Sequence, residues 1–200
     1  MLLLSVPDTS RAEHIIAAVT SLFVAAGAFI KWWLPYWDSR KHRAGAVEGY
    51  QALRVICQTL DRSATLGSER TILFGAHDSG GFPKPGAPFY TTPLQWKVRE
   101  DKTVNIQDFH ALSVDSAYID MLLELERHGT HRYNFDETHC MLGRIYAAEG
   151  IKDAFLIFLG IHEYTFFYVS FASYERKFTK HEITNFELLA GSLAHEIKKS

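Results

Sequence analysis

The longest apolar stretch of the chain lies near its start. From Ile15 to Leu34 it holds about 20 residues interrupted by one charge, Lys31, and this length matches the hydrocarbon core of a bilayer. Aromatic residues typical of a membrane interface stand at its C-terminal end: Trp32, Trp33, Tyr36 and Trp37. The pattern predicts a single transmembrane helix over residues 15–37 that contacts the lipid bilayer.

The charges on either side of this helix predict its orientation. A basic segment over residues 38–43 contains Arg40, Lys41 and Arg43, whereas the tail over residues 1–14 has one arginine against two acidic residues. The positive-inside rule then places the C-terminal side in the cytoplasm. We expect a single-pass protein of the inner (cytoplasmic) membrane whose domain over residues 44–200 lies in the cytosol.

Three other interpretations of the apolar stretch stay open. A signal peptide would need a cleavage site among small residues, which Ala25 to Ala28 supply, and a basic start, which the chain lacks. A buried core helix would fit the 16 residues from Ile15 that precede Lys31. An in-plane interfacial helix would need a polar face, and the stretch is apolar all round.

Beyond residue 44 the pattern alternates between helices and strands. Apolar residues at helical spacing predict a helix over Val47–Leu60, and two short runs predict strands over Thr71–Ala76 and Leu94–Arg99. Residues 82–93 hold four of the six prolines, which predicts an irregular loop without strand pairing.

Two helices and a short polar strand or turn are predicted in the middle of the domain. An apolar stripe from Val114 to Leu125 is expected to begin at a cap, Ser113 or Asp115, and to stop at Gly129. After the strand or turn over residues 130–135, Asp136 is expected to cap a short helix that ends at Gly150.

The C-terminal part predicts a hairpin and a long helix. Strands over Ala154–Leu159 and Tyr164–Phe171 flank a compact loop over Gly160–Glu163. Thr179 with Glu182 three residues later forms a capping box that begins the last helix. The order of elements predicts an α+β fold with a mainly antiparallel sheet.

This C-terminal part resembles the end of a GAF domain. The resemblance rests on the glycine-led strand from Gly150 to Ile157, the run Phe167–Ser173, and the Phe178-Thr179 start of the last helix. The order of elements extends it over about residues 44–199. GAF domains are generally small-ligand sensors or dimerising regulatory modules, so the resemblance implies a GAF-like fold, a regulatory role and a homodimer.

The ligand signatures of the family are incomplete in this chain. Cyclic-nucleotide-binding members carry a lysine that is missing beside the run Asn134–Glu137. Bilin-binding members have a cysteine followed by histidine, and here His139 precedes Cys140 instead. The resemblance therefore names no cofactor.

Residues 77–81, His-Asp-Ser-Gly-Gly, resemble the nucleophile region of trypsin-like proteases and an aspartic protease half-site. The other motifs of both enzymes are absent, so no catalytic residue is assigned, and a hydrolase using His77, Asp78 and Ser79 is kept as an alternative function. The loop that follows has aromatic residues among its prolines and is a candidate binding element. The candidate ligand-binding residues are His77, Asp78, Ser79, Phe82, Phe89, Tyr90, Tyr118, His139 and Cys140.

Composition removes several classes of function. The chain is 47% hydrophobic and 22% charged with a net charge of −2, which excludes a disordered tail and disfavours nucleic acid as a partner. Two cysteines are too few for a disulfide-rich secreted protein. His128 and His131 flank a predicted helix end, and adjacent His139 and Cys140 cannot easily face one ion, so no metal is assigned.

These observations favour a membrane-tethered, GAF-like sensory or regulatory domain that binds a small ligand or a protein partner. The sequence shows no output domain, so we expect such a protein to act through another chain. A structural or assembly protein with a degenerate GAF-like fold is a further alternative.

Overall fold

A computed structural model of the chain describes residues 47–78, 89–109, 112–135 and 140–199. The expected membrane helix over residues 15–37 lies outside these residues, as do its flanking segments. Among the residues that are described, no helix has the length and apolar character needed to cross a membrane. The chain divides into two compact units, Met1–Gly49 and Tyr50–Ser200, and the fold below is that of the second.

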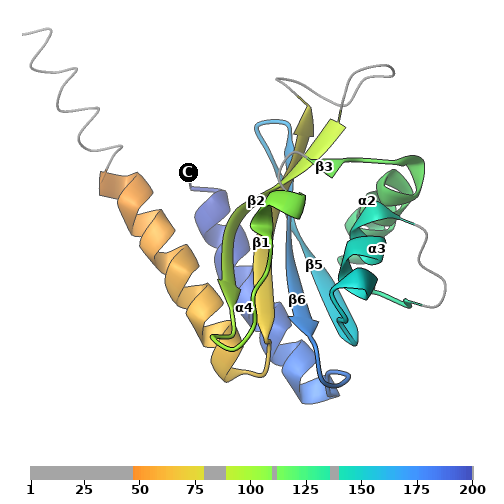
Figure 1. The fold of residues 1–200 in the computed structure, drawn as a ribbon. Coiled ribbons are helices and arrows are strands. Elements are labelled where there is room, and N and C mark those ends of the chain that lie inside the picture. The colour runs from red at the N-terminus through yellow and green to blue at the C-terminus, as the bar shows by residue number, and fades with distance from the viewer. Residues whose placement is uncertain (1–46, 79–88, 110–111, 136–139, 200) are drawn as a thin grey trace, which may run out of the picture. The chain divides into compact units, whose positions relative to one another are not determined.

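Six antiparallel strands form one sheet in the order β3-β2-β1-β6-β5-β4, so β1 and β6 lie at its centre (Figure 1). The strands are β1 (Arg70–Asp78), β2 (Phe89–Val98), β3 (Leu112–Ser113), β4 (Thr130–Arg132), β5 (Asp153–His162) and β6 (Thr165–Ser173). The α+β fold with a mainly antiparallel sheet is thus confirmed.

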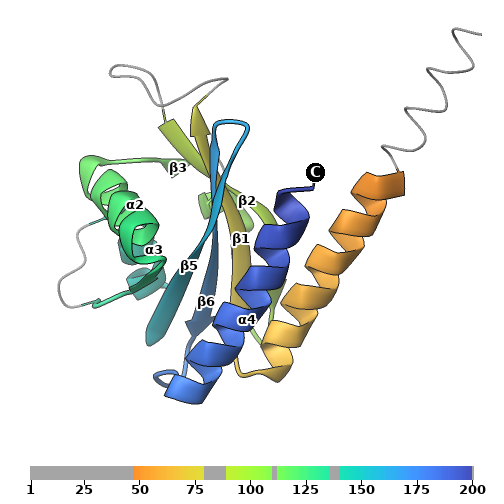
Figure 2. The same cartoon turned by 180° about the vertical axis from the view of Figure 1, so that it is seen from behind.

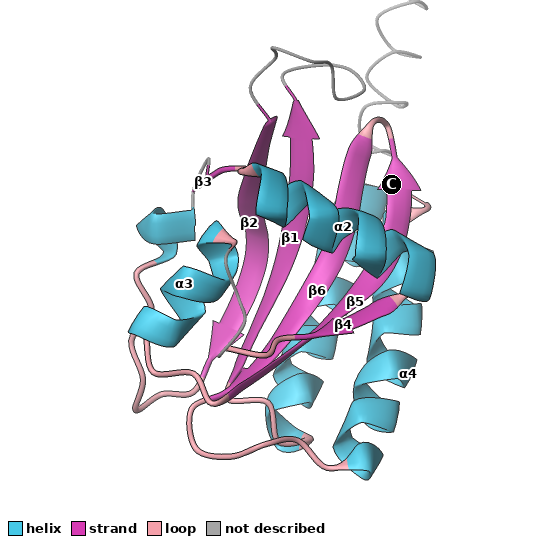
Figure 3. Ribbon diagram, turned by 90° about the vertical axis from the view of Figure 1, so that its right-hand side faces the viewer, coloured by secondary structure: helices cyan, strands magenta, loops and turns pink. Residues whose placement is uncertain are grey.

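Helices cover both faces of the sheet (Figures 2 and 3). One face packs against α2 (Ser116–His128) and α3 (Met141–Ala148), preceded by the short 3-10 helix η1 (Ile106–Phe109). The other packs against α4 (Lys180–Ile197) and against residues 50–65 of the helix that runs over residues 47–65. Because side chains alternate along a strand, Ile72 and Phe74 of β1 face α2 and α3 while Leu73 faces α4.

The prediction for the proline-rich loop is wrong at its C-terminal end. β2 begins at Phe89, and its first residues pair with β1 through Pro93. The register shifts between Leu73 and Phe74, opposite an extra residue of β2, Leu94. A proline is tolerated beside such a bulge because the ladder is already interrupted there.

The helix ends mostly follow the predicted caps. Asp115 begins α2, where its Oδ1 accepts a 2.8 Å hydrogen bond from the backbone N–H of Tyr118, and Gly129 ends the helix with φ 75°. The capping box of Thr179 and Glu182 is present at α4. The expected Asp136 cap is wrong, because α3 begins after Cys140, whose Sγ accepts from Gly143 N–H at 3.5 Å.

The predicted β5–β6 hairpin is confirmed, with a tighter turn than expected. His162 pairs with Thr165, so the loop consists of Glu163 and Tyr164, both with positive φ (44° and 65°). This is the backbone of the primed turns that fit the twist of a hairpin. Gly160, expected in the loop, lies in β5 beside a register shift.

The start of α4 gives a prediction about pH. Arg176 donates to both carboxylate oxygens of Glu182, at 2.9 Å and 2.5 Å, and this hydrogen bonding lowers the pKa of Glu182 to about 2. A carboxyl whose pKa is lower in the folded state stabilises the fold above its unfolded pKa of about 4. That contribution is lost as the pH falls from about 4 toward 2.

We expect Arg176→Gln to raise the Glu182 pKa toward its ordinary value and to flatten the acid limb of the stability curve. A carboxyl-detected NMR titration and thermal unfolding across this pH range measure the two effects. An unchanged Glu182 pKa in the variant would contradict the assignment.

Candidate functional site

The sheet separates the candidate ligand residues at the β1–β2 end into two groups. His77 pairs with Tyr90 and Asp78 pairs with Phe89. Cross-strand partners share a face and neighbours along a strand do not, so His77 and Asp78 point to opposite sides of the sheet. The Nδ1 atom of His77 lies 3.3 Å from the backbone carbonyl oxygen of Asp78, not beside the Asp78 carboxylate. Ser79, Phe82 and His139 lie outside the described residues.

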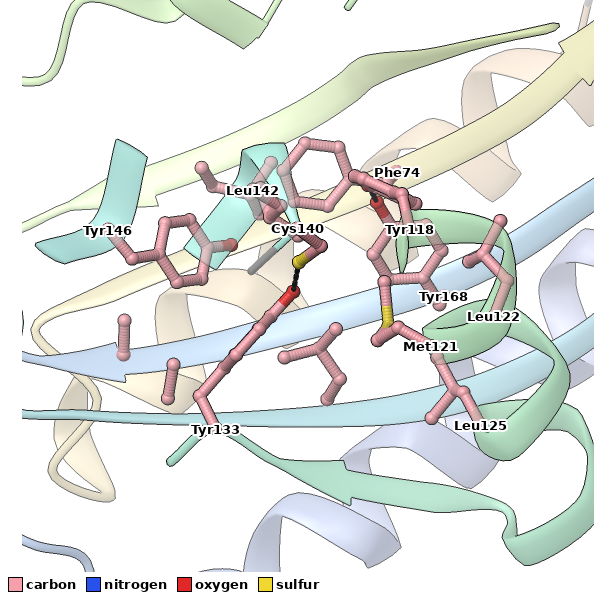
Figure 4. Close-up of a cluster of buried hydrophobic side chains, with 14 of the residues drawn as sticks. Phe74, Tyr118, Met121, Leu122, Leu125, Tyr133, Cys140, Leu142, Tyr146 and Tyr168 are labelled. Carbon is pink, nitrogen blue, oxygen red and sulfur yellow. Dashed lines mark hydrogen bonds between the residues drawn. The ribbon is translucent and has the colours of Figure 1, made fainter. Parts of the chain in front are cut away.

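Tyr118 and Cys140 belong to one buried cluster between the sheet and the α2–α3 layer, which we call the aromatic core (Figure 4). Phe89 packs against this core from its partly buried position on β2. The core contains four almost fully buried tyrosines, which come from α2, the position after β4, α3 and β6: Tyr118, Tyr133, Tyr146 and Tyr168. A buried tyrosine must find a partner for its hydroxyl, so these four define the polar content of the site.

Three hydroxyls form a chain through the core. Thr91 Oγ1 of β2 lies 3.0 Å from Tyr168 Oη of β6, and Tyr168 Oη is in turn hydrogen-bonded to Tyr118 Oη of α2. The ring of Phe74 stacks on Tyr168 with centroids 5.0 Å apart. This hydroxyl chain, Thr91–Tyr168–Tyr118, ties α2 to two strands that are not neighbours in the sheet.

The other two tyrosines are also paired. Tyr133 Oη lies 3.5 Å from the Sγ of Cys140, the sulfur that caps α3 (Figure 4). Tyr146 Oη donates to Ser170 Oγ at 2.8 Å. Each hydroxyl of the four core tyrosines therefore has a partner from within the chain.

Burial keeps these phenols protonated. Loss of water raises the pKa of Tyr118, and it raises the pKa values of Tyr133 and Tyr168 well above 10. The core therefore offers neutral hydroxyl groups and holds no phenolate that would act as a base or nucleophile at neutral pH.

The histidine-rich segment near β4 does not assemble a metal centre from described residues. His131 Nδ1 lies 3.7 Å from Glu124 Oε2, and its ring stands nearly perpendicular to the Tyr133 ring with the ring centroids 5.1 Å apart. Burial lowers the pKa of His131. No three potential metal ligands gather anywhere in the part of the chain that is described.

The sequence predicts Tyr118 and Cys140 as candidate ligand residues but does not predict their partners. Tyr168 lies within the predicted strand Tyr164–Phe171, and Thr91 lies in a segment expected to be irregular. One feature of the sequence does indicate a polar core: alternation along β6 places Tyr168 and Ser170, both with hydroxyl groups, on the same inward face as Ala172. Their partners stand far away in the sequence, so the pairing is a property of the fold.

Comparison with known proteins identifies the fold. No protein-family model matches the sequence, and no curated protein is similar to it. The GAF domain/HD domain protein from Geobacter sulfurreducens is similar in structure, with TM-score 0.54 and 10% identity over 74% of this chain and 92% of that one.

Two further solved structures give the same result. The blue-light absorbing form of the Thermosynechococcus elongatus PixJ GAF domain has TM-score 0.54 and 14% identity over 76% of this chain and 88% of its own. A phycocyanobilin-bound GAF domain from a cyanobacterial phytochrome has TM-score 0.52 and 11% identity, over 76% and 94%. The domain therefore has a GAF-like fold, as the sequence resemblance implied.

The hydroxyl chain makes a prediction about stability. Tyr168→Phe removes its central member and leaves the buried hydroxyls of Thr91 and Tyr118 without their partner, which we expect to cost about 2 kcal/mol of unfolding free energy. Tyr118→Phe removes a terminal member and should cost about 1 kcal/mol. The double variant should be little worse than Tyr168→Phe alone, because both changes remove the same bond.

Chemical denaturation measures these differences. Equal and additive effects at Tyr118 and Tyr168 would show that the two hydroxyls do not interact.

Proposed function

We propose that this chain is a regulatory domain with a GAF-like fold that acts through contacts with other protein chains, first of all a second copy of itself. The observation that carries the proposal is the aromatic core. The space between the sheet and the α2–α3 layer is occupied by the chain's own tyrosines, whose hydroxyls are paired with one another and with neighbouring groups. A domain whose core is occupied by its own side chains is suited to respond to contacts that other proteins make on its surface.

The state of Cys140 also supports this proposal over attachment of a pigment. The phytochrome GAF domain that resembles this fold is described as phycocyanobilin-bound. In this chain the Cys140 side chain is buried, and its sulfur is engaged by Gly143 N–H and Tyr133 Oη. A thiol used as a helix cap in an apolar core is poorly placed to bond a large exogenous group.

Exposed apolar side chains support the second copy as a partner. The helix over residues 50–65 and α4 lie on the same face of the sheet (Figures 1 and 2). Tyr50 is 75% exposed and Leu53, nearly one turn later, is 46% exposed, while Leu188 of α4 is 69% exposed. Pairing two such layers would remove these side chains from water, a gain of about 25 cal/mol for each Å² of apolar surface.

A membrane tether completes the proposal. Residues 15–37 would hold the domain at the inner membrane, with Lys31, the tryptophans and Arg40, Lys41 and Arg43 at the interface. The length of the apolar run and the basic residues after it support this placement, with the GAF-like domain in the cytosol.

An assembly protein with a degenerate GAF-like fold is the second candidate, and the filled aromatic core favours it as well. Both candidates require contacts with another chain. They differ in whether those contacts respond to a signal, which a regulatory domain requires and a static scaffold does not.

The dimer is tested by charging its expected surface. We expect the full chain in detergent to sediment as a dimer, and Tyr50→Glu combined with Leu53→Glu to shift it to a monomer, because a buried unpaired carboxylate opposes association. The matched control is Leu123→Glu on α2, which is 55% exposed on the opposite face and should leave the dimer intact. If the unmodified chain sediments as a monomer, a second copy of the chain is not its partner.

Membrane topology is tested with proteases on sealed vesicles. We expect the domain to be digested in inside-out vesicles and protected in right-side-out ones. Replacement of Arg40, Lys41 and Arg43 by glutamate should place a fraction of the molecules in the opposite orientation. Protection in inside-out vesicles would contradict the orientation, and recovery of the domain in the soluble fraction would contradict the tether.

A further inference from the structure

One end of the second compact unit brings together three parts of the chain (Figures 1 and 2). The helix over residues 50–65 starts there, α4 stops there, and the turn between β5 and β6 lies there. A Cβ atom placed on Gly160 would lie 3.9 Å from Lys198 Cε, so the last residues of α4 approach the hairpin. We call the surface made by residues 160–165 and 197–199 the hairpin end.

The β5–β6 turn exposes two large side chains at the hairpin end. Ile161 is 56% exposed and Tyr164 is 52% exposed, and only two residues separate them in the sequence. Aliphatic side chains together with tyrosine are typical of protein surfaces that enter the interface of a bilayer. A tyrosine there buries its ring and keeps its hydroxyl among the hydrated headgroups. The two side chains therefore suit a lipid surface.

The backbone of this turn favours other residues than those it carries. Glu163 and Tyr164 have φ of 44° and 65°, in the left-handed region where asparagine and glycine are the usual residues of a two-residue hairpin. A tyrosine adopts this conformation at a cost in backbone energy that glycine avoids. Strain kept at an exposed position indicates that the side chain itself is used.

Charge does not draw the hairpin end to an anionic surface. Apart from two histidines, the charged residues described at the ends of β1, β5 and α4 and in the turn are three acids and two lysines: Asp78, Glu163, Glu196, Lys198 and Lys199. Lys199 Nζ also lies 3.1 Å from a Glu196 carboxylate oxygen, which leaves no basic surface. A contact with lipid at this end therefore depends on burying apolar surface and does not require anionic headgroups.

The tether proposed above joins the domain at the same end. Its apolar run is followed by residues 38–50, which lead to the start of the helix over residues 50–65. These 13 residues reach at most about 45 Å when fully extended. The 18 residues of α4 span about 27 Å, and α4 begins at the opposite end of the domain (Figure 2). A tether joined in this way would hold the hairpin end nearer to the bilayer than the start of α4.

We propose that the hairpin end rests on the bilayer, with Ile161 and the ring of Tyr164 inserted among the lipid headgroups. The proposal depends on the tether of the proposed function and adds a second point of contact, which fixes the orientation of the domain on the membrane. It does not involve Leu53 or Leu188, so the proposed dimer can fail without affecting it.

The test uses the full chain reconstituted in vesicles of neutral phosphatidylcholine, with a nitroxide label at Ile161→Cys. Cys57→Ser removes the partly exposed thiol from the background, and Cys140 is buried. We expect the label to lose most of its collisions with a water-soluble nickel complex and to keep its collisions with oxygen, which dissolves in lipid. The matched control is a label at Lys180→Cys, an exposed position at the other end of α4, which should stay accessible to the nickel complex.

A second variant separates the tyrosine side chain from the backbone of the turn. Glu163→Asn combined with Tyr164→Gly keeps the turn and relieves its strain, so this variant should fold with no loss in Tm. Without the tyrosine ring, we expect the Ile161→Cys label to regain access to the nickel complex. Unchanged shielding would show that Tyr164 takes no part in the contact and would overturn the proposal as stated.

Three further results would overturn the proposal, and they can be told apart. If the chain floats with the vesicles and the two labels are equally accessible to the nickel complex, the tether stands and the hairpin contact does not exist. If the Ile161→Cys label is shielded from both reagents, protein covers the hairpin end in place of lipid. If the chain does not float with the vesicles, the tether is wrong and the hairpin contact falls with it.

Discussion

The sheet of this domain is buried on both faces, and any polar group within those faces must be satisfied inside the protein. The two faces meet this constraint differently. The face against α4 is filled mainly by apolar residues such as Val169, Phe171 and Leu193. Its buried Thr71 is satisfied close by in the sequence, by hydrogen bonds with Ser63 and Ser68. The face against α2 and α3 carries tyrosines, so its packing and its hydrogen bonds are determined together. The chain Thr91–Tyr168–Tyr118 is the result.

Local signals were sufficient to predict most helices and strands. Asp115, Gly129 and the Thr179 capping box act within a few residues of themselves, and each marks a helix end in the structure. The start of β2 escaped prediction because the bulge that admits Pro93 depends on register against β1. The cap of α3 was assigned to Asp136, since carboxylates are the commoner caps, while a cysteine serves in its place.

The candidate site could be predicted only in part for the same reason. Tyr118 and Cys140 were recognised, but their roles follow from Tyr168 and Tyr133, which approach them only after folding. His77 and Asp78 looked like a pair in the sequence, and strand alternation places them on opposite faces.

The regulatory role proposed for this domain depends on an aromatic core that is filled by the chain's own side chains. Native mass spectrometry of the full chain, released gently from detergent, tests this most directly. We predict a mass that corresponds to the polypeptide alone, in multiples of the chain, with no added organic molecule of nucleotide or tetrapyrrole size. A stoichiometric molecule of that size, retained by the unmodified chain and lost in Tyr168→Phe, would contradict the claim and identify the core as a ligand pocket.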